Sequence, residues 1–237
     1  MTLFEPNVVL QKLEQGDEFK QAELSRLKLE STEIDEAKFI ECYMRGAILA
    51  DVSCRQANFR GTNLTFAKLN RVNLSEANLE RTELNSASLH DVTLNDANGY
   101  KLRLFGAKLN EVKAIHTNLA FADLRQISGN NIYFSSANLA KAFLTQAICD
   151  RINFERATII SIDFTDSTLL SANFEGAKLN GVNLTNANLQ DANLEKTTWH
   201  DITFNNCNVD DAVFSDASGF TDEQKQWLKQ NGALNVG

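Results

Sequence analysis

A hydrophobic position recurs at every fifth residue over most of the chain. From Leu24 to Phe214, leucine or phenylalanine fills most of these positions. A second ladder of mostly small residues, from Ala22 to Ala217, lies two residues before each of them. The register does not slip by a single residue between these limits. We therefore expect that no loop is inserted anywhere in the repeats.

A five-residue period differs from the 3.6-residue period of an α-helix and from the two-residue period of a plain strand. The small residue points inward, the next residue outward and the large hydrophobic residue inward again, which is the alternation of a short strand. The two residues that follow must turn a corner. Glycine occupies the second corner position at Gly46, Gly61, Gly106, Gly176 and Gly181, where a type II turn requires positive φ. Each repeat therefore predicts one straight side and one bend.

The motif Ala-Asn-Leu, followed by two variable residues, recurs openly and begins at Ala77, Ala137, Ala187 and Ala192. This motif resembles the consensus A(D/N)Lxx of the pentapeptide-repeat family. The resemblance implies an all-β fold, a right-handed quadrilateral (square) β-helix solenoid in which four sides close one coil. About ten such coils, stacked at roughly 4.8 Å each, would make a rod about 50 Å long.

Both ends of the repeats carry signals for a short helix. Pro6 suits a first helical turn, and Thr221 with Gln224 has the pattern of a capping box. We expect a single pentapeptide-repeat domain over residues 1–237, divided into an N-terminal helical cap (1–21), the repeats (22–219) and a C-terminal helical cap (220–237). Caps of this kind seal the open coils of a solenoid. We expect a monomer, and dimerisation through the C-terminal cap is the alternative.

Composition narrows the classes of function. The net charge of −8 argues against direct nucleic-acid binding, because phosphate recognition needs clustered lysine and arginine. The first ten residues show no signal peptide, and no apolar run is long enough to span a membrane, so we expect no membrane association. The four cysteines have no CxxC spacing, which favours a cytoplasmic protein with reduced thiols.

The sequence contains no pattern typical of catalysis. His90, His116 and His200 fall on corner positions, without a second ligand that would complete a metal site. The cysteines fall on inward positions and are interpreted as small hydrophobic residues. A square coil also leaves no cleft for a substrate. We therefore expect a protein that is not an enzyme, with no catalytic residue, no cofactor and no metal.

The outer surface departs from the repeat in the middle coils. Stacking by 20 residues brings four aromatic and four basic side chains to one edge, where the family usually places small polar residues: Tyr100, Lys101, Arg103, Phe105, Phe121, Arg125, Lys141 and Phe143. We call this set the aromatic–basic edge. Aromatic residues and arginine are enriched at binding hot spots, so we predict a site for a protein partner. The alternative is that some of these aromatic side chains tuck inward to fill gaps at Gly99, Ala114 and Gly129, for instance Tyr100 beside Gly99.

The C-terminal coils are strongly acidic. Eleven carboxylates lie between residues 161 and 223 against two lysines, Lys178 and Lys196. A rod of duplex dimensions with this charge is a candidate DNA mimic. A solvated acidic surface that keeps the protein soluble is the simpler interpretation.

The family resemblance implies a non-enzymatic protein–protein interaction module. Length, unbroken register and cap helices favour a likeness to members that regulate cell differentiation in filamentous cyanobacteria, in heterocyst development and nitrogen-fixation patterning. The partner would then be a regulatory protein, such as a transcriptional regulator of differentiation. The alternative is a DNA-mimicking modulator that protects or inhibits DNA gyrase. Gyrase-active members typically carry loop insertions or a substantial C-terminal dimer module, and this chain shows neither.

Overall fold

Parallel pairing between residues 20 apart builds the whole structure. Leu29 pairs with Leu49, and Leu49 pairs with Leu69. One ladder runs in steps of 20 from Lys38 to Ser218 and contains nine steps. The chain therefore forms a solenoid of about nine turns, close to the ten expected from the repeats.

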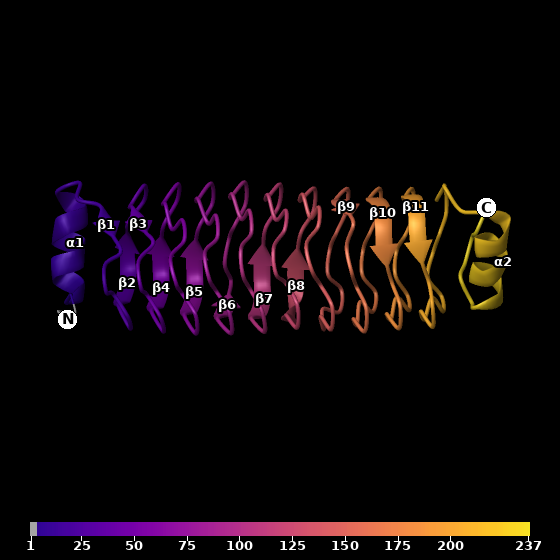
Figure 1. Cartoon of the computed structure of the whole chain (residues 1–237), viewed down its shortest axis with the longest axis horizontal. Helices are drawn as coiled ribbons and strands as arrows, with labels where there is room; N and C mark the ends of the chain where they lie inside the picture. Colours follow the sequence, from indigo (N-terminus) through magenta and orange to yellow (C-terminus); the bar gives the residue numbers. More distant parts are fainter. Residues whose placement is uncertain (1–3) are drawn as a thin grey trace.

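The computed structural model describes residues 4–237, and Figure 1 shows a straight rod with one helix across each end. Its elements are α1 (Pro6–Glu14), β1 (Phe19–Lys20), β2 (Lys28–Glu33), β3 (Phe39–Ile40), β4 (Ile48–Ser53), β5 (Lys68–Asn73), β6 (Ser88–His90), β7 (Lys108–Lys113), β8 (Ser128–Tyr133), β9 (Thr158–Ile160), β10 (Lys178–Asn183), β11 (Thr198–Thr203) and α2 (Asp222–Gln230). The predicted square β-helix with short helices at both ends is confirmed.

The corners adopt the left-handed backbone that the glycines predicted. Gly46 and Gly61 both have φ of +67°, and Gly106 has φ of +65°. Most other coils place a non-glycine residue in the same conformation, such as Lys101 at +58° and Phe121 at +60°. The N–H of Phe121 donates to the Ala140 carbonyl of the next coil at 2.9 Å. Inter-coil hydrogen bonds of this kind stabilise a backbone that costs about 1–2 kcal/mol per L-residue.

Outward asparagines satisfy the corner amide that the coils leave free. The side-chain oxygen of Asn58 accepts the N–H of Arg60 at 3.0 Å, and Asn63 does the same for Thr65. Asn118 also donates to the side-chain oxygen of Asn98, one coil away, at 3.2 Å. The prevalence of asparagine at this position therefore has a structural cause, because a backbone N–H without an acceptor is costly.

The longer strands lie on one side of the rod in its N-terminal half and on the other side in its C-terminal half. Strands β2, β4, β5, β6, β7 and β8 form one sheet, whereas β9, β10 and β11 form another that is offset by half a coil. The two sets of arrows point in opposite directions in Figure 1. At the change, Gly129 has φ of +154°, and a Cβ there would lie 1.6 Å from the Leu109 carbonyl oxygen. Only glycine fits this position, which explains why a large hydrophobic residue is missing from the ladder at Gly129.

The interior contains two layers of side chains, as the two ladders predicted. The alanines between Ala22 and Ala217 are buried along one ladder, and leucine and phenylalanine are buried along the other. Phe154 lies between two other phenylalanines of the interior, with ring centroids 4.9 Å from Phe174 and 5.8 Å from Phe134. Close packing of this kind leaves little room for altered volumes.

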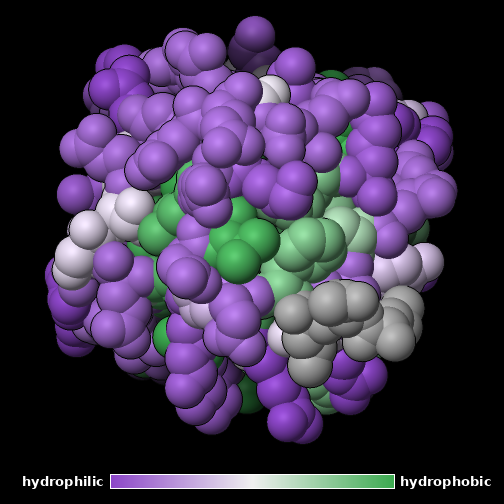
Figure 2. Space-filling view, turned by 90° about the vertical axis from the view of Figure 1, so that its left-hand side faces the viewer, coloured by the Kyte–Doolittle hydropathy of each residue, from purple (hydrophilic) through white to green (hydrophobic). Residues whose placement is uncertain are grey.

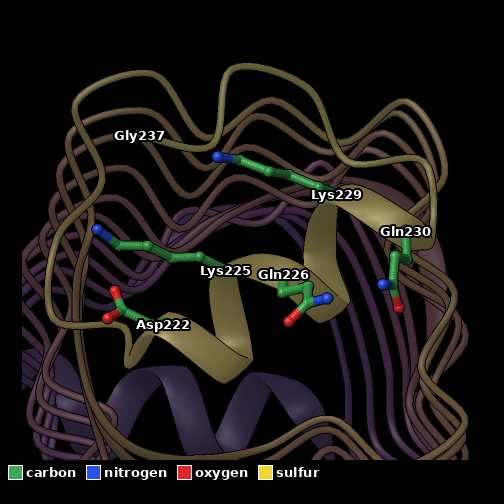
Figure 3. A pocket seen from close by; sticks show the side chains of 6 residues that line it. All are labelled: Asp222, Lys225, Gln226, Lys229, Gln230 and Gly237. Carbon is green, nitrogen blue, oxygen red and sulfur yellow. The ribbon is translucent and has the colours of Figure 1, made fainter.

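The two helices cover the open ends, but their outer sides differ. α2 begins with the predicted capping box, since Thr221 accepts from the Gln224 amide and Gln224 accepts from the Thr221 amide. Its outward side is polar and carries Lys225 and Lys229 (Figure 3). The N-terminal end shows a hydrophobic area within a hydrophilic rim (Figure 2). Residues 1–3 of the predicted N-terminal cap lie outside the described residues.

The polar outward side of α2 favours a cap that covers the last coil over a dimer interface. The apolar side of α2 is already used, because the Trp227 ring stacks on Phe204 at 5.5 Å and Leu228 is buried. After α2 the chain returns to the solenoid, where Leu234 pairs with Val213. The last coil is therefore closed by the chain itself.

Replacing Phe154 by alanine tests the packing of the interior. Phe154 is fully buried, so we expect the free energy of unfolding to fall by about 3–5 kcal/mol in urea titrations. Phe143, in a neighbouring coil, is 49% exposed and is the matched control, for which we expect a loss below about 1 kcal/mol. Equal losses for the two alanine variants would contradict the assignment of inward and outward positions.

Candidate protein-binding surface

The structure brings the residues of the aromatic–basic edge together on one side of the rod. They occupy adjacent rows that run along the axis: Lys101, Phe121 and Lys141 in one row, Arg103, Asp123 and Phe143 in the next, and Phe105 with Arg125 in a third. Five of the eight predicted residues, together with Asp123, line a shallow depression of about 400 Å³. Tyr100 lies beside this depression and packs edge-on against Phe121, with ring centroids 5.6 Å apart.

Three phenylalanines of this edge face solvent. Phe105 is 38% exposed, Phe121 39% and Phe143 49%. The gap at Gly99 is filled from within, because a Cβ there would lie 3.0 Å from a Leu119 methyl group. The structure therefore does not support gap filling by these three rings, and Tyr100 packs on Phe121 instead of entering the coil.

Phe121 lies between two lysines of the adjacent coils. The Nζ atom of Lys101 is 5.9 Å from the centroid of the Phe121 ring, and that of Lys141 is 5.3 Å from it. Lys101 also lies 5.2 Å from the centroid of Tyr100. Both distances to Phe121 are in the range of cation–π attraction. Within residues 4–237, neither ammonium group has a carboxylate oxygen within 4.0 Å.

The two arginines of the edge are held by carboxylates. Arg103 forms an ion pair with Glu83 at 2.8 Å, and Arg125 binds Asp123 through two hydrogen bonds of 2.7 Å. Burial by itself would raise the pKa of Asp123, but the hydrogen bonds and the charge of Arg125 outweigh burial and lower it. Asp123 therefore stays ionised at neutral pH and fixes the Arg125 guanidinium, whose carbon lies 5.5 Å from the centroid of the Phe105 ring.

Two residues of the edge lack the side-chain oxygen that caps the corner N–H in other coils. Arg103 and Phe143 stand where other coils place an asparagine that accepts the N–H two residues ahead. The N–H of Phe105 donates to Asn85 of the preceding coil instead. The N–H of Thr145 has no acceptor among the protein groups of residues 4–237. The edge thus carries side chains that lower the regularity of the coil, which indicates a role outside folding.

The same side of the rod carries aromatic residues that the sequence analysis missed. Tyr43 and Phe66 are each 49% exposed, and the guanidinium carbon of Arg45 lies 4.8 Å from the centroid of the Phe66 ring. Tyr43 lies three coils before Arg103 in the same row. Applying the 20-residue stacking to the N-terminal coils would have found all three residues.

The groups capable of catalysis or metal binding are scattered or buried. Cys42, Cys54, Cys149 and Cys207 are free and buried, and burial raises the pKa of the Cys149 and Cys207 thiols to about 12. Across residues 4–237, no three His, Cys, Asp or Glu side chains are grouped as metal ligands. Neither α1 nor α2 has the length and apolar character needed to cross a membrane.

Replacing Phe121 by glycine tests whether this ring is free of a structural role. Glycine adopts φ of +60° without the steric cost that phenylalanine bears there, so we expect the free energy of unfolding to change by less than about 1 kcal/mol. The control is Phe121→Val, whose β-branched side chain is strained in this region and should destabilise more. A loss of several kcal/mol for Phe121→Gly in urea titrations would show that the ring is needed for folding.

Comparison with solved structures identifies proteins that have a similar fold. The solved structure of HetL, a pentapeptide repeat protein involved in heterocyst differentiation regulation from the cyanobacterium Nostoc sp. strain PCC 7120, matches 92% of this chain and 100% of its own, with 24% identity and a TM-score of 0.57. The structure of QnrB1, a plasmid-mediated fluoroquinolone resistance protein, matches 88% of this chain and 97% of its own, with 16% identity and a TM-score of 0.43. At this identity, the likeness to HetL shows the fold alone. A comparison with curated proteins gave no match.

A family model described as pentapeptide repeats matches the sequence in eight copies. The matched residues are 37–75, 63–98, 115–148, 132–169, 147–186 and 169–198. These matches cover more than half of the chain and agree with the coils seen in the structure. The chain therefore belongs to the pentapeptide-repeat family.

Proposed function

We propose that this protein is a non-enzymatic interaction module that binds a protein partner through the aromatic–basic edge. The observation that carries the proposal is the set of three exposed phenylalanines among four cations, on a rod whose other outward positions are mostly small and polar. Exposed aromatic side chains favour aggregation unless a partner covers them. Their persistence on a regular scaffold is best explained by a binding role.

The arrangement has the composition of a binding hot spot. Phe105 and Phe121 present apolar surface, and Arg125 is fixed by Asp123 before a partner arrives. A side chain that is already ordered loses less entropy on binding. The rigid coil beneath the edge holds the rings in fixed relative positions, which suits recognition of one surface.

We extend the proposal to a regulatory role in cell differentiation, exerted in the cytoplasm by binding a regulatory protein such as a transcriptional regulator. This extension rests on the unbroken register and the two short caps of this chain, and on a fold similar to that of HetL over 92% of this chain. A cytoplasmic location is consistent with four free cysteines that are all buried.

DNA mimicry directed at gyrase is the alternative, and the acidic C-terminal coils favour it. Asp163 and Asp166 lie three residues apart on this part of the rod, and both are held by side-chain hydrogen bonds, to Thr165 and Asn186 respectively. Fixed carboxylates could imitate phosphates. A supercoiling assay separates the two functions, because dose-dependent inhibition of gyrase or protection from a fluoroquinolone would replace our first proposal by this one.

The double variant Arg103→Glu with Phe105→Ala tests the binding surface. We expect affinity capture from the native cytoplasm to lose its specific partner, with recovery reduced at least about tenfold, since hot-spot truncations cost 2 kcal/mol or more. The matched control is Lys113→Glu with Tyr133→Ala, which changes one basic and one exposed aromatic residue in neighbouring coils on the opposite side of the rod.

Circular dichroism must show that both double variants keep the fold. Undiminished capture by the edge variant would contradict the proposal. If only the control variant lost the partner, the binding surface would be assigned to the opposite side of the rod.

A further inference from the structure

We propose that the row formed by Lys101, Phe121 and Lys141 binds a short acidic segment of the partner that carries an apolar side chain. The proposal rests on the proposed function and deepens it, because it names the chemistry that the partner must present. Three features of the structure support it: two cations without an anion, a basic band of limited length, and an apolar depression beside them.

The two lysines share one aromatic ring, and the described residues 4–237 place no carboxylate oxygen within 4.0 Å of either ammonium group. Their Nζ atoms lie 5.9 and 5.3 Å from the centroid of Phe121, so two like charges converge on the same ring. The two ammonium charges repel each other in the absence of an anion. An acidic group placed over Phe121 would neutralise both lysines at once.

The neighbouring carboxylates are already engaged. Asp123 is bound by Arg125 and Glu83 by Arg103. In the next coil, Asp163 accepts hydrogen bonds from Thr165 and Asn183. The acidic groups of the chain that lie nearest to this row therefore have other partners, and the anion must come from another molecule.

The length of the basic band limits the size of that anion. Residues 98–160 contain eight basic and four acidic residues, whereas residues 1–97 contain eleven basic and sixteen acidic ones. On the other side, residues 161–223 contain two basic and eleven acidic residues. The basic band covers about three coils, or about 15 Å, which an extended segment of about five residues spans. A longer polyanion would run onto acidic coils at both ends and be repelled.

The depression next to Phe121 adds an apolar requirement. Its volume of about 400 Å³ is bordered by the rings of Phe121 and Phe143, with Arg103 and Arg125 at its rim. A leucine or phenylalanine side chain can cover these rings, while acidic neighbours reach Lys101 and Lys141. The segment should therefore combine one or two carboxylates with an adjacent large apolar residue.

Selection from a random twelve-residue peptide library against the full chain tests this inference. We expect the selected peptides to contain acidic residues next to leucine, phenylalanine or tryptophan, and fluorescence anisotropy should show binding by labelled copies of them. The double variant Lys101→Glu with Lys141→Glu should weaken their binding at least tenfold. Phe121→Gly should weaken it similarly without lowering the melting temperature.

The matched control is Lys68→Glu with Lys108→Glu. These lysines are also 40 residues apart and exposed, but they lie in the row of β5 and β7 on another side of the rod. We expect less than a twofold change in affinity. No enrichment, enrichment of peptides without acidic residues, or peptide binding that survives Lys101→Glu with Lys141→Glu would each overturn the inference.

A ten-nucleotide oligothymidylate serves as the competing probe. Oligothymidylate binding that exceeds peptide binding and is lost in Lys101→Glu with Lys141→Glu would assign the row to single-stranded nucleic acid and overturn the inference. Failure of this inference is distinguishable from failure of the proposed function. The protein partner could still be captured by Lys101→Glu with Lys141→Glu but not by Arg103→Glu with Phe105→Ala. That result would support the proposed interaction module and contradict only the proposed acidic segment.

Discussion

Hydrogen bonds between coils 20 residues apart are the interaction on which the rest of this structure depends. The N–H of the large inward residue Leu64 donates to the Glu83 carbonyl of the following coil. The N–H of Asn63 donates to the Cys42 carbonyl of the preceding coil. These bonds require every corner to adopt a left-handed residue, including Phe66 at φ of +61°. Because the coils pair over their whole length, an inserted residue would break the register of everything beyond it. This explains why the chain keeps its five-residue period without interruption.

The stacking also determines how a surface can be built on this fold. Residues that are 20 positions apart become neighbours, so Lys101, Phe121 and Lys141 form one row although they are distant in sequence. The rows are rigid because hydrogen bonds between coils hold the backbone beneath them. Function can therefore be encoded by changing outward residues alone, as at Arg103 and Phe143, while the two inward ladders keep the coil intact.

Most of the fold could be predicted from the sequence because one physical pattern repeats. The two ladders gave the inward positions, and glycines such as Gly46 located the left-handed corners. The left-handed conformation of Lys101 and Phe121 could not be inferred from residue type, since these side chains disfavour it and only the inter-coil bonds impose it. The change from one sheet to the other near Gly129 could not be predicted either. The five-residue period gives the positions of the corners, but it does not show which sides of the coil form the longer strands.

The candidate surface was predictable in part, and the missing part has a simple cause. The predicted edge is found as a group on one side of the rod, with Tyr100 packed on Phe121. Tyr43 and Phe66 were not predicted because they lie outside the middle coils, where the outer surface departs from the repeat, although the same 20-residue stacking applies to them. The ion pairs of Arg103 and Arg125 depend on side-chain geometry, so sequence alone does not distinguish these paired cations from the unpaired Lys101 and Lys141.

The distance between spin labels at Ser25 and Thr145 tests the 20-residue stacking most directly. Six parallel steps connect Glu23 to Phe143, and each label would lie two residues further on. Burial of the four native thiols, which raises the pKa of Cys149 to about 12, keeps labelling at the introduced cysteines. Six turns of about 4.8 Å predict a narrow distribution near 29 Å in double electron–electron resonance. A broad distribution, or a mean distance beyond about 40 Å, would contradict the stacking of these coils.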